Sequence, residues 1–177
     1  DAFMIQNLRE YDSKALKNVD DPDLELAPDL KDAGEKESTA ELSAEDFAKL
    51  ILRIKEVLGE HVVEVREAKV LKDSPARLVS PESGPEREMQ RVRRLLESDY
   101  ETPARILEVN RGHPLIQNLS GLVQTDFANP LIDLSIEQLF DNLLLVEGLL
   151  ANPVQMVPRI QSLLERATRV QTGAPDN

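Results

Sequence analysis

Residues 135–150 would be apolar around almost their whole circumference as an α-helix. One stripe, at the spacing of a coiled-coil seam, contains Leu139, Leu143, Val146 and Leu150. Much of the remaining circumference is taken up by Phe140, Leu144, Leu145 and Leu149. A surface helix of a globular domain has a single apolar stripe, whereas a helix like this one must be covered on several sides. This segment therefore limits the possible folds more than any other in the chain.

Two arrangements would cover this helix. In the first, the final helix, predicted over 153–168, and the same pair of helices from a second chain pack around it in a two-fold symmetric four-helix arrangement. In the second, the helix is wholly buried within one subunit. We expect self-association, with a dimer interface that contains Leu139, Leu143, Val146, Leu150, Met156, Ile160, Leu163 and Leu164.

The start of the final helix carries two conflicting signals. Asn152 followed by Pro153 is typical of an N-cap and a proline at the first helical position. Pro158 comes six residues after the cap, where a proline removes a helical hydrogen bond. We therefore expect Pro158 to bend the helix or to delay its start.

The remaining segments predict an α+β fold. A helix is expected over 43–58, with Ser43 as its N-cap and Gly59 at its C-cap. Valine-rich residues 61–71 and the short segment 77–80 are predicted to be strands that pair as a hairpin, and residues 104–110 a third strand. Helices are expected over 85–98 and 114–122. The predicted architecture is a small three-stranded sheet with flanking helices, ending in a helical pair that forms a four-helix-bundle dimer.

Charge divides the chain. The net charge is −12, and residues 1–41 contribute twelve acids and five bases to it. Residues 20–41 also lack apolar periodicity, which is typical of a linker. We expect residues 1–26 to be the edge of a preceding domain, 27–40 an acidic linker, 41–170 the self-associating domain and 171–177 a flexible tail. A surface this acidic repels phosphate backbones, so nucleic acid is not an expected partner.

Several features that are absent from the sequence narrow the classes of protein to which the chain can belong. There is no run of 18 apolar residues that would span a membrane, and no signal peptide is recognisable at the start. The first residue is not methionine, so we expect a fragment of a longer protein. The absence of cysteine excludes thiol chemistry and fits a reducing compartment.

The predicted helix 85–98 has a second apolar face, which contains Met89, Val92, Leu95 and Leu96. The simpler interpretation is that this face packs on the sheet. The alternative is an exposed strip that binds unfolded client polypeptide, for which an adaptable methionine is suited. We keep these four residues as a candidate client-binding site.

No catalytic or metal site is predicted. The two histidines, His61 and His113, are far apart in the sequence and lack the spacing of metal ligands. His113 precedes Pro114 at a helix start, where a capping or packing role is expected. No glycine-rich phosphate loop or nucleophile motif is present. A small acid/base or metal-dependent hydrolase is therefore the least favoured function.

Several of these segments resemble the C-terminal dimerisation domain of the heat shock protein 90 chaperones, in the bacterial branch called high-temperature protein G. Residues 71–76 (LKDSPA) are similar to the turn after that family's first long strand, and residues 1–14 to the end of its middle domain. Residues 106–110, followed by His113-Pro114-Leu115, resemble the family's LEIN-x-x-HPL segment, although Arg111 stands where bacterial members often have proline. The closing helical pair is matched by Phe140-Asp141-Asn142, Glu147-Gly148, Asn152-Pro153, Arg159-Ile160 and Leu163-Leu164.

The resemblance implies a homodimerisation module, which also has a possible client-binding role, of an ATP-dependent chaperone that assists folding under stress. ATP and Mg²⁺ would bind in a domain outside this chain, so the chain itself would need no cofactor and would not be an enzyme. Its partners would be a second copy and unfolded clients, without nucleic acid or membrane, in the cytoplasm. The alternative is a monomeric adaptor that binds another protein through the helix at 135–150.

Overall fold

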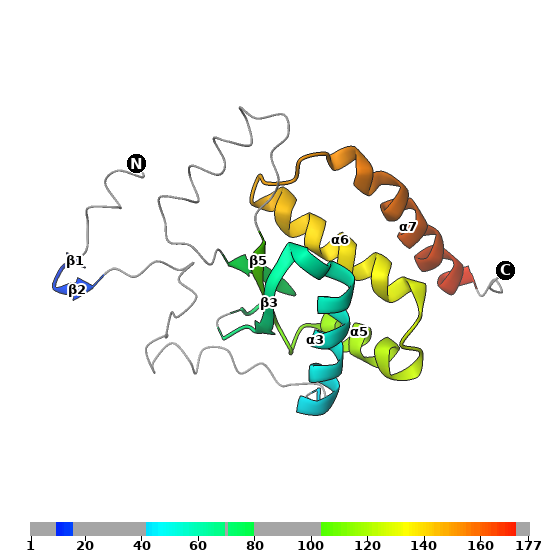
Figure 1. The fold of residues 1–177 in the computed structure, drawn as a ribbon, viewed down its shortest axis with the longest axis horizontal. Coiled ribbons are helices and arrows are strands. Elements are labelled where there is room, and N and C mark those ends of the chain that lie inside the picture. The colour runs from blue at the N-terminus through cyan, green and yellow to red at the C-terminus, as the bar shows by residue number, and fades with distance from the viewer. Residues whose placement is uncertain (1–9, 16–41, 70, 80–103, 173–177) are drawn as a thin grey trace.

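The computed structural model describes residues 10–15, 42–69, 71–79 and 104–172 (Figure 1). The first of these ranges is a short antiparallel hairpin of β1 (Glu10–Tyr11) and β2 (Lys14–Ala15). The other ranges form a mixed α+β unit with a three-stranded sheet, which confirms the α+β part of the predicted fold. The predicted helix at 85–98, with the candidate client residues Met89, Val92, Leu95 and Leu96, lies outside the described residues.

The first helix, α3 (Ala44–Leu58), begins and ends where the sequence predicts. The Ser43 side chain accepts a hydrogen bond from the Asp46 amide, and Gly59 adopts a positive φ of 51° at the C-terminal end. Phe47, Leu50 and Ile54 are buried on the inner face of the helix. A short 3₁₀ turn, η2 (Gly59–His61), leads from α3 into the sheet.

Three strands form the sheet, in the order β3-β5-β4. They are β3 (Val62–Glu67), β4 (Ala76–Val79) and β5 (Arg105–Val109). β5 is parallel to β3 and antiparallel to β4. The predicted hairpin of the first two strands is therefore wrong: they run in opposite directions, as a hairpin requires, but β5 lies between them.

Residues 71–75 connect β3 to β4 past the end of β5. The Asn110 side chain donates hydrogen bonds to the carbonyl oxygens of Lys72 and Ser74, at 3.2 and 3.1 Å. The backbone amide of Asn110 donates to the Pro75 carbonyl at 2.8 Å. These bonds fix the connection across the end of the central strand.

Two further helices follow the sheet. In α5 (Pro114–Thr125), His113 is the N-cap, as predicted, because its Nδ1 accepts a hydrogen bond from the Leu115 amide at 3.1 Å. The next helix, α6 (Pro130–Val146), begins five residues before the predicted start and ends four before the predicted end. Asn129 caps it, and Pro130 takes the first helical position.

The layers follow from these contacts. α3 packs on β3 and α6 on β4, so both cover one face of the sheet, while α5 packs against α3. Their shared core includes Leu50, Leu107, Ile116 and Ile132. The last helix, α7 (Val157–Thr172), lies outside α6 at the edge of the molecule (Figure 1).

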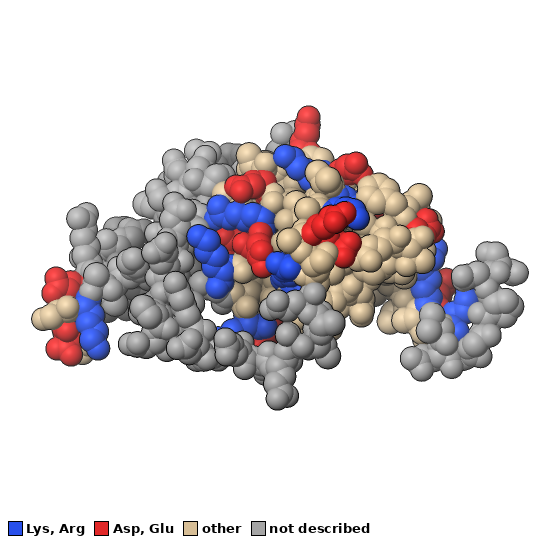
Figure 2. All heavy atoms as spheres, turned by 90° about the horizontal axis from the view of Figure 1, so that it is seen from below, with Lys and Arg blue, Asp and Glu red and all other residues tan. Residues whose placement is uncertain are grey.

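Charges on the described surface are mixed in sign. Figure 2 shows one face of the molecule, on which lysine and arginine side chains lie beside aspartate and glutamate side chains. No helix in the described ranges is long and apolar enough to cross a membrane.

Candidate self-association surface

The chain turns back on itself between α6 and α7. Gly148 has a positive φ of 70°, and the amides of Gly148 and Leu149 donate to the carbonyl oxygens of Leu145 and Leu144. This is the pattern of a Schellman motif, which ends a helix and satisfies its last carbonyl groups. Leu149 and Leu150 are buried just beyond it, so the turn is anchored to the core.

The final helix starts late. Residues Pro153–Met156 form a 3₁₀ turn, η3, in which Asn152 caps the first amides and Met156 is buried. α7 begins at Val157, which makes Pro158 its second residue, where no helical amide donor is needed. The prediction that Pro158 delays the helix is confirmed. From here α7 runs back along α6 (Figure 1).

α7 buries little of itself in the single chain. Among residues 157–169, whose side chains the structure describes, none is buried. The strongest polar attachment to α6 is Arg159, which forms ion pairs with Glu137 at 3.2 Å and Asp141 at 2.7 Å. Most stability of a helix in a protein comes from packing an apolar face, so a helix with no buried side chain lacks that support.

Six large apolar side chains are exposed around the turn. They are Leu145 and Val146 at the end of α6, Val154 in η3, and Val157, Ile160 and Leu164 in α7. The spacing of the last three places them on one face of the helix. Val146 is 83% exposed and Leu164 59%. We call these six residues the C-terminal apolar surface.

The predicted interface residues divide between this surface and the core. Leu139, Leu150 and Met156 are buried within the chain, and Leu143 and Leu163 are partly buried. Val146, Ile160 and Leu164 are exposed. Three exposed residues of this surface, Leu145, Val154 and Val157, are not among those predicted for the interface from the sequence. For Val157, the spacing to Ile160 and Leu164 was a usable signal.

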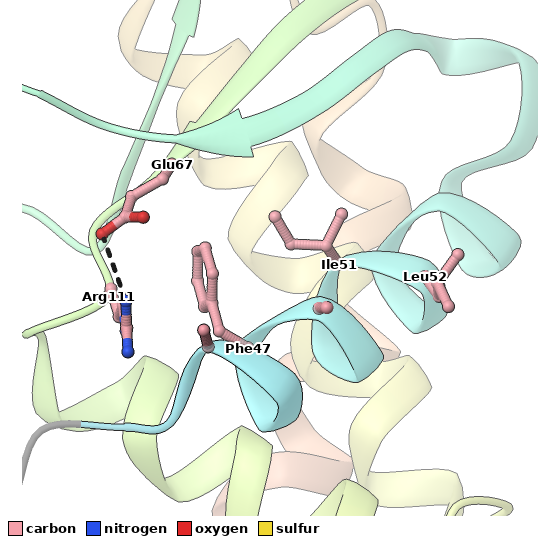
Figure 3. A pocket seen from close by; sticks show the side chains of 7 residues that line it. Phe47, Ile51, Leu52, Glu67 and Arg111 are labelled. Carbon is pink, nitrogen blue, oxygen red and sulfur yellow. Dashed lines mark ion pairs between the residues drawn. The ribbon is translucent and has the colours of Figure 1, made fainter.

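A second feature is a shallow groove between α3 and the end of β3. Its volume is about 480 Å³, and it is lined by Ala44, Phe47, Ala48, Ile51, Leu52, Glu67 and Arg111. Phe47 and Ile51 project from α3 toward the strand above it, while Glu67 and Arg111 face each other across 4.0 Å at one end (Figure 3). Arg111 also donates to the Leu42 carbonyl and lies over the Phe47 ring. Its guanidinium group therefore ties the start of α3 to the sheet.

The described residues include both histidines of the chain, the residue type most often used for acid–base chemistry and metal binding. The described part of the chain contains no cluster of three or more histidine, cysteine or acidic side chains that could hold a metal ion. His113 is occupied as an N-cap, and the His61 ring lies against Phe140 with the centroids 6.1 Å apart. The pKa of Lys49 is raised by its hydrogen bond with Glu45, but an exposed pair one turn apart is a feature that stabilises helices.

Comparison with known proteins identifies close relatives. A family described as "Hsp90 protein" matches residues 1–176. "Chaperone protein HtpG" of Desulfitobacterium hafniense is 40% identical over 96% of this chain and 26% of the relative, and that of Chlorobium luteolum is 36% identical over 95% and 26%. The protein of the same name from Oleidesulfovibrio alaskensis is 33% identical over 95% of this chain and 27% of the relative. The chain thus spans about a quarter of the length of these curated relatives.

Proposed function

The chain belongs to the Hsp90 family of chaperones, and on that premise we propose that residues 41–170 are the homodimerisation domain of an ATP-dependent molecular chaperone. The C-terminal apolar surface is the observation that carries this proposal. It lies along the end of α6, the turn η3 and the first part of α7, and none of the side chains that the structure describes in α7, at residues 157–169, is buried. A second copy placed on it by two-fold symmetry would complete a four-helix arrangement of two α6 and two α7 helices.

The geometry supports specific roles for the residues predicted at the interface. Val146, Ile160 and Leu164 would meet the partner directly, with Leu145, Val154 and Val157 beside them. Leu139, Leu143, Leu150, Met156 and Leu163 would instead support α6 and α7 from within. Isologous interfaces of stable dimers usually bury at least about 1,200 Å² in total.

Dimerisation would serve the rest of the protein. Joining two copies raises the effective concentration of their other domains for one another, typically to about millimolar. An ATP-dependent closure between those domains would then be an intramolecular step. We propose that the protein acts in the cytoplasm. Fractionation of cells that express the full-length protein would test this location.

Sedimentation equilibrium tests the proposal. The chain has a mass of 19.8 kDa, and we expect roughly twice this value in solution at tens of micromolar. A monomeric mass would overturn the proposal. The alternative, a monomeric adaptor that uses the same surface for a different protein, predicts that monomeric mass.

We also propose that this chain has no enzymatic activity and binds neither ATP nor Mg²⁺, because its sequence lacks a loop that could hold phosphates. Calorimetric titration of the chain with Mg-ATP should therefore give no binding heat. A saturable signal in the micromolar range would contradict this assignment. The nucleotide would bind in a part of the protein outside this chain.

Client binding is proposed for residues 85–98, through Met89, Val92, Leu95 and Leu96. Replacing Leu95 and Leu96 by asparagine should weaken the suppression of a model client's aggregation while leaving the melting temperature almost unchanged. If these leucines are core residues, the same change should lower the free energy of unfolding by about 2–5 kcal/mol per site. A loss of stability of that size would contradict the client-binding proposal.

A further inference from the structure

The structure points to a role for Arg159 that rests on the proposed function. We infer that Arg159 is the positioning residue of the dimer surface: it holds α7 on α6 in the one rotation that presents Val157, Ile160 and Leu164 outward. Within α7, Arg159 forms two ion pairs with α6, whereas none of the side chains described at residues 157–169 is buried.

The contacts of Arg159 are specific in geometry. Its Nε lies 3.2 Å from the Glu137 carboxylate, and its Nη1 donates to the Asp141 carboxylate at 2.7 Å. The two acids are four residues apart on α6, so they lie on one face, one helical turn from each other. Only 17% of the arginine side chain is exposed. A planar guanidinium group can bridge two carboxylates in this way, whereas the point charge of a lysine cannot do so equally well.

This clamp sets the rotation of α7 about its own axis. Successive residues of an α-helix are rotated by about 100°, so when Arg159 points toward α6, Val157 lies about 160° away and Leu164 about 140° away. Ile160 lies about 100° away. Fixing one side chain therefore directs the apolar stripe of α7 away from its own chain.

Apolar packing alone does not fix this rotation. The stripe formed by Val157, Ile160 and Leu164 is more apolar than the side that meets α6, where Arg159 and Arg166 flank the partly buried Leu163. Without the clamp, α7 could turn its stripe onto the apolar residues of α6. The polar clamp opposes that rotation, because the rotation would break the hydrogen bonds of Arg159 with Glu137 and Asp141.

Each protomer contributes one α7 to the dimer. The dissociation constant therefore depends on the square of the fraction of chains whose α7 is correctly oriented. If loss of the charged hydrogen bonds lowers the fraction of correctly oriented α7 to about one tenth, the dissociation constant of the dimer rises about 100-fold. The fold of α3 and the sheet should be unaffected, since the ion pairs of Arg159 among the described residues join α7 to α6 alone.

The test compares four variants of the full chain. Arg159→Gln and the double variant Glu137→Gln/Asp141→Asn each remove one side of the clamp, and Arg159→Lys keeps the charge without the planar fork. Arg166→Gln is the matched control, because Arg166 lies on the same side of α7 two turns later and has no ion pair among the described residues. Sedimentation equilibrium gives the dissociation constants, and hydrogen exchange gives the protection of α7 and α3 amides.

We expect Arg159→Gln and the double carboxylate variant to weaken the dimer about 100-fold, Arg159→Lys by less, and Arg166→Gln hardly at all. Protection should fall in α7 and stay unchanged in α3. Dissociation constants of both clamp variants within about threefold of the wild type would overturn the role of Arg159 and leave the dimer proposal intact. A monomeric wild type would overturn both. If Arg159→Gln alone fails to fold, the carboxylate variant decides the question.

Discussion

Leu164→Asp should make the protein monomeric without unfolding it, if the proposed dimer forms through the C-terminal apolar surface. Leu164 is 59% exposed in the single chain, so the introduced carboxylate is largely solvated in the monomer. In the proposed dimer it would be buried without a partner, and two-fold symmetry would bury it twice. Burying an unpaired charge costs several kcal/mol, so the dissociation constant should rise at least about a thousand-fold.

The control is Leu52→Asp on α3. Leu52 is 62% exposed, it also lies in a helix, and the substitution has the same intrinsic cost for that helix. It lies away from the C-terminal apolar surface, so the mass in solution should remain that of a dimer. Sedimentation equilibrium and the concentration dependence of the melting temperature distinguish the variants, since only a dimer's melting temperature depends on protein concentration. Equal effects of the two substitutions would mean that Leu164 does not lie in the interface.

The boundaries of the helical pair could have been predicted more closely from signals already present in the sequence. Asn129-Pro130 is the same N-cap and proline pair as Asn152-Pro153, yet the predicted helix began five residues too late. Gly148 has a positive φ just past the end of α6, as Gly59 has just past the end of α3. At Gly148 a run of leucines concealed the helix end, because apolar periodicity continues through it into Leu149 and Leu150, which are also buried.

The strand order was harder to predict. Short connections favour pairing of consecutive strands, which is why the sequence indicated a hairpin of residues 61–71 and 77–80. The insertion of β5 depends on contacts between residues far apart in the chain. Glu108 lies between the apolar residues Leu107 and Val109 of β5, and its two arginine partners come from the strands on either side. A charged residue in the middle of a buried strand was the available sign that this strand is central, but its partners are evident only in three dimensions.

Exposure within the leucine-rich helix could not be predicted from the sequence either. Leu144 and Leu145 are adjacent and chemically identical, but the first is buried against the core and the second is exposed. Which of them faces outward depends on where α3, the sheet and α7 lie around α6. The sequence indicated that the helix needs cover on several sides. The structure identifies the sides that the chain itself covers.

Glu108→Ala should strongly destabilise the fold, because it removes a buried carboxylate that joins two arginines. The Glu108 side chain is only 4% exposed, and it accepts hydrogen bonds from Arg66 at 2.8 and 3.0 Å and from Arg77 at 2.7 Å. The three residues are in register across β3, β5 and β4. Removing the carboxylate leaves two guanidinium groups close together without the anion between them. Breaking a buried ion pair in this way costs about 3–5 kcal/mol, a large part of the 5–15 kcal/mol that stabilises a typical domain.

Two further variants distinguish the cost of breaking these ion pairs from the net contribution of the whole charged set to the free energy of unfolding. Glu67→Ala removes a half-exposed carboxylate that lies 4.0 Å from Arg111, and it should cost less than about 1 kcal/mol. Replacing the whole set, as in Arg66→Met/Glu108→Leu/Arg77→Met, should restore much of the stability lost in Glu108→Ala, because an apolar set avoids the desolvation of three charges. Urea unfolding at one fixed protein concentration measures all three. If Glu108→Ala costs no more than Glu67→Ala, these charges do not hold the three strands together, and the order β3-β5-β4 depends on apolar packing alone.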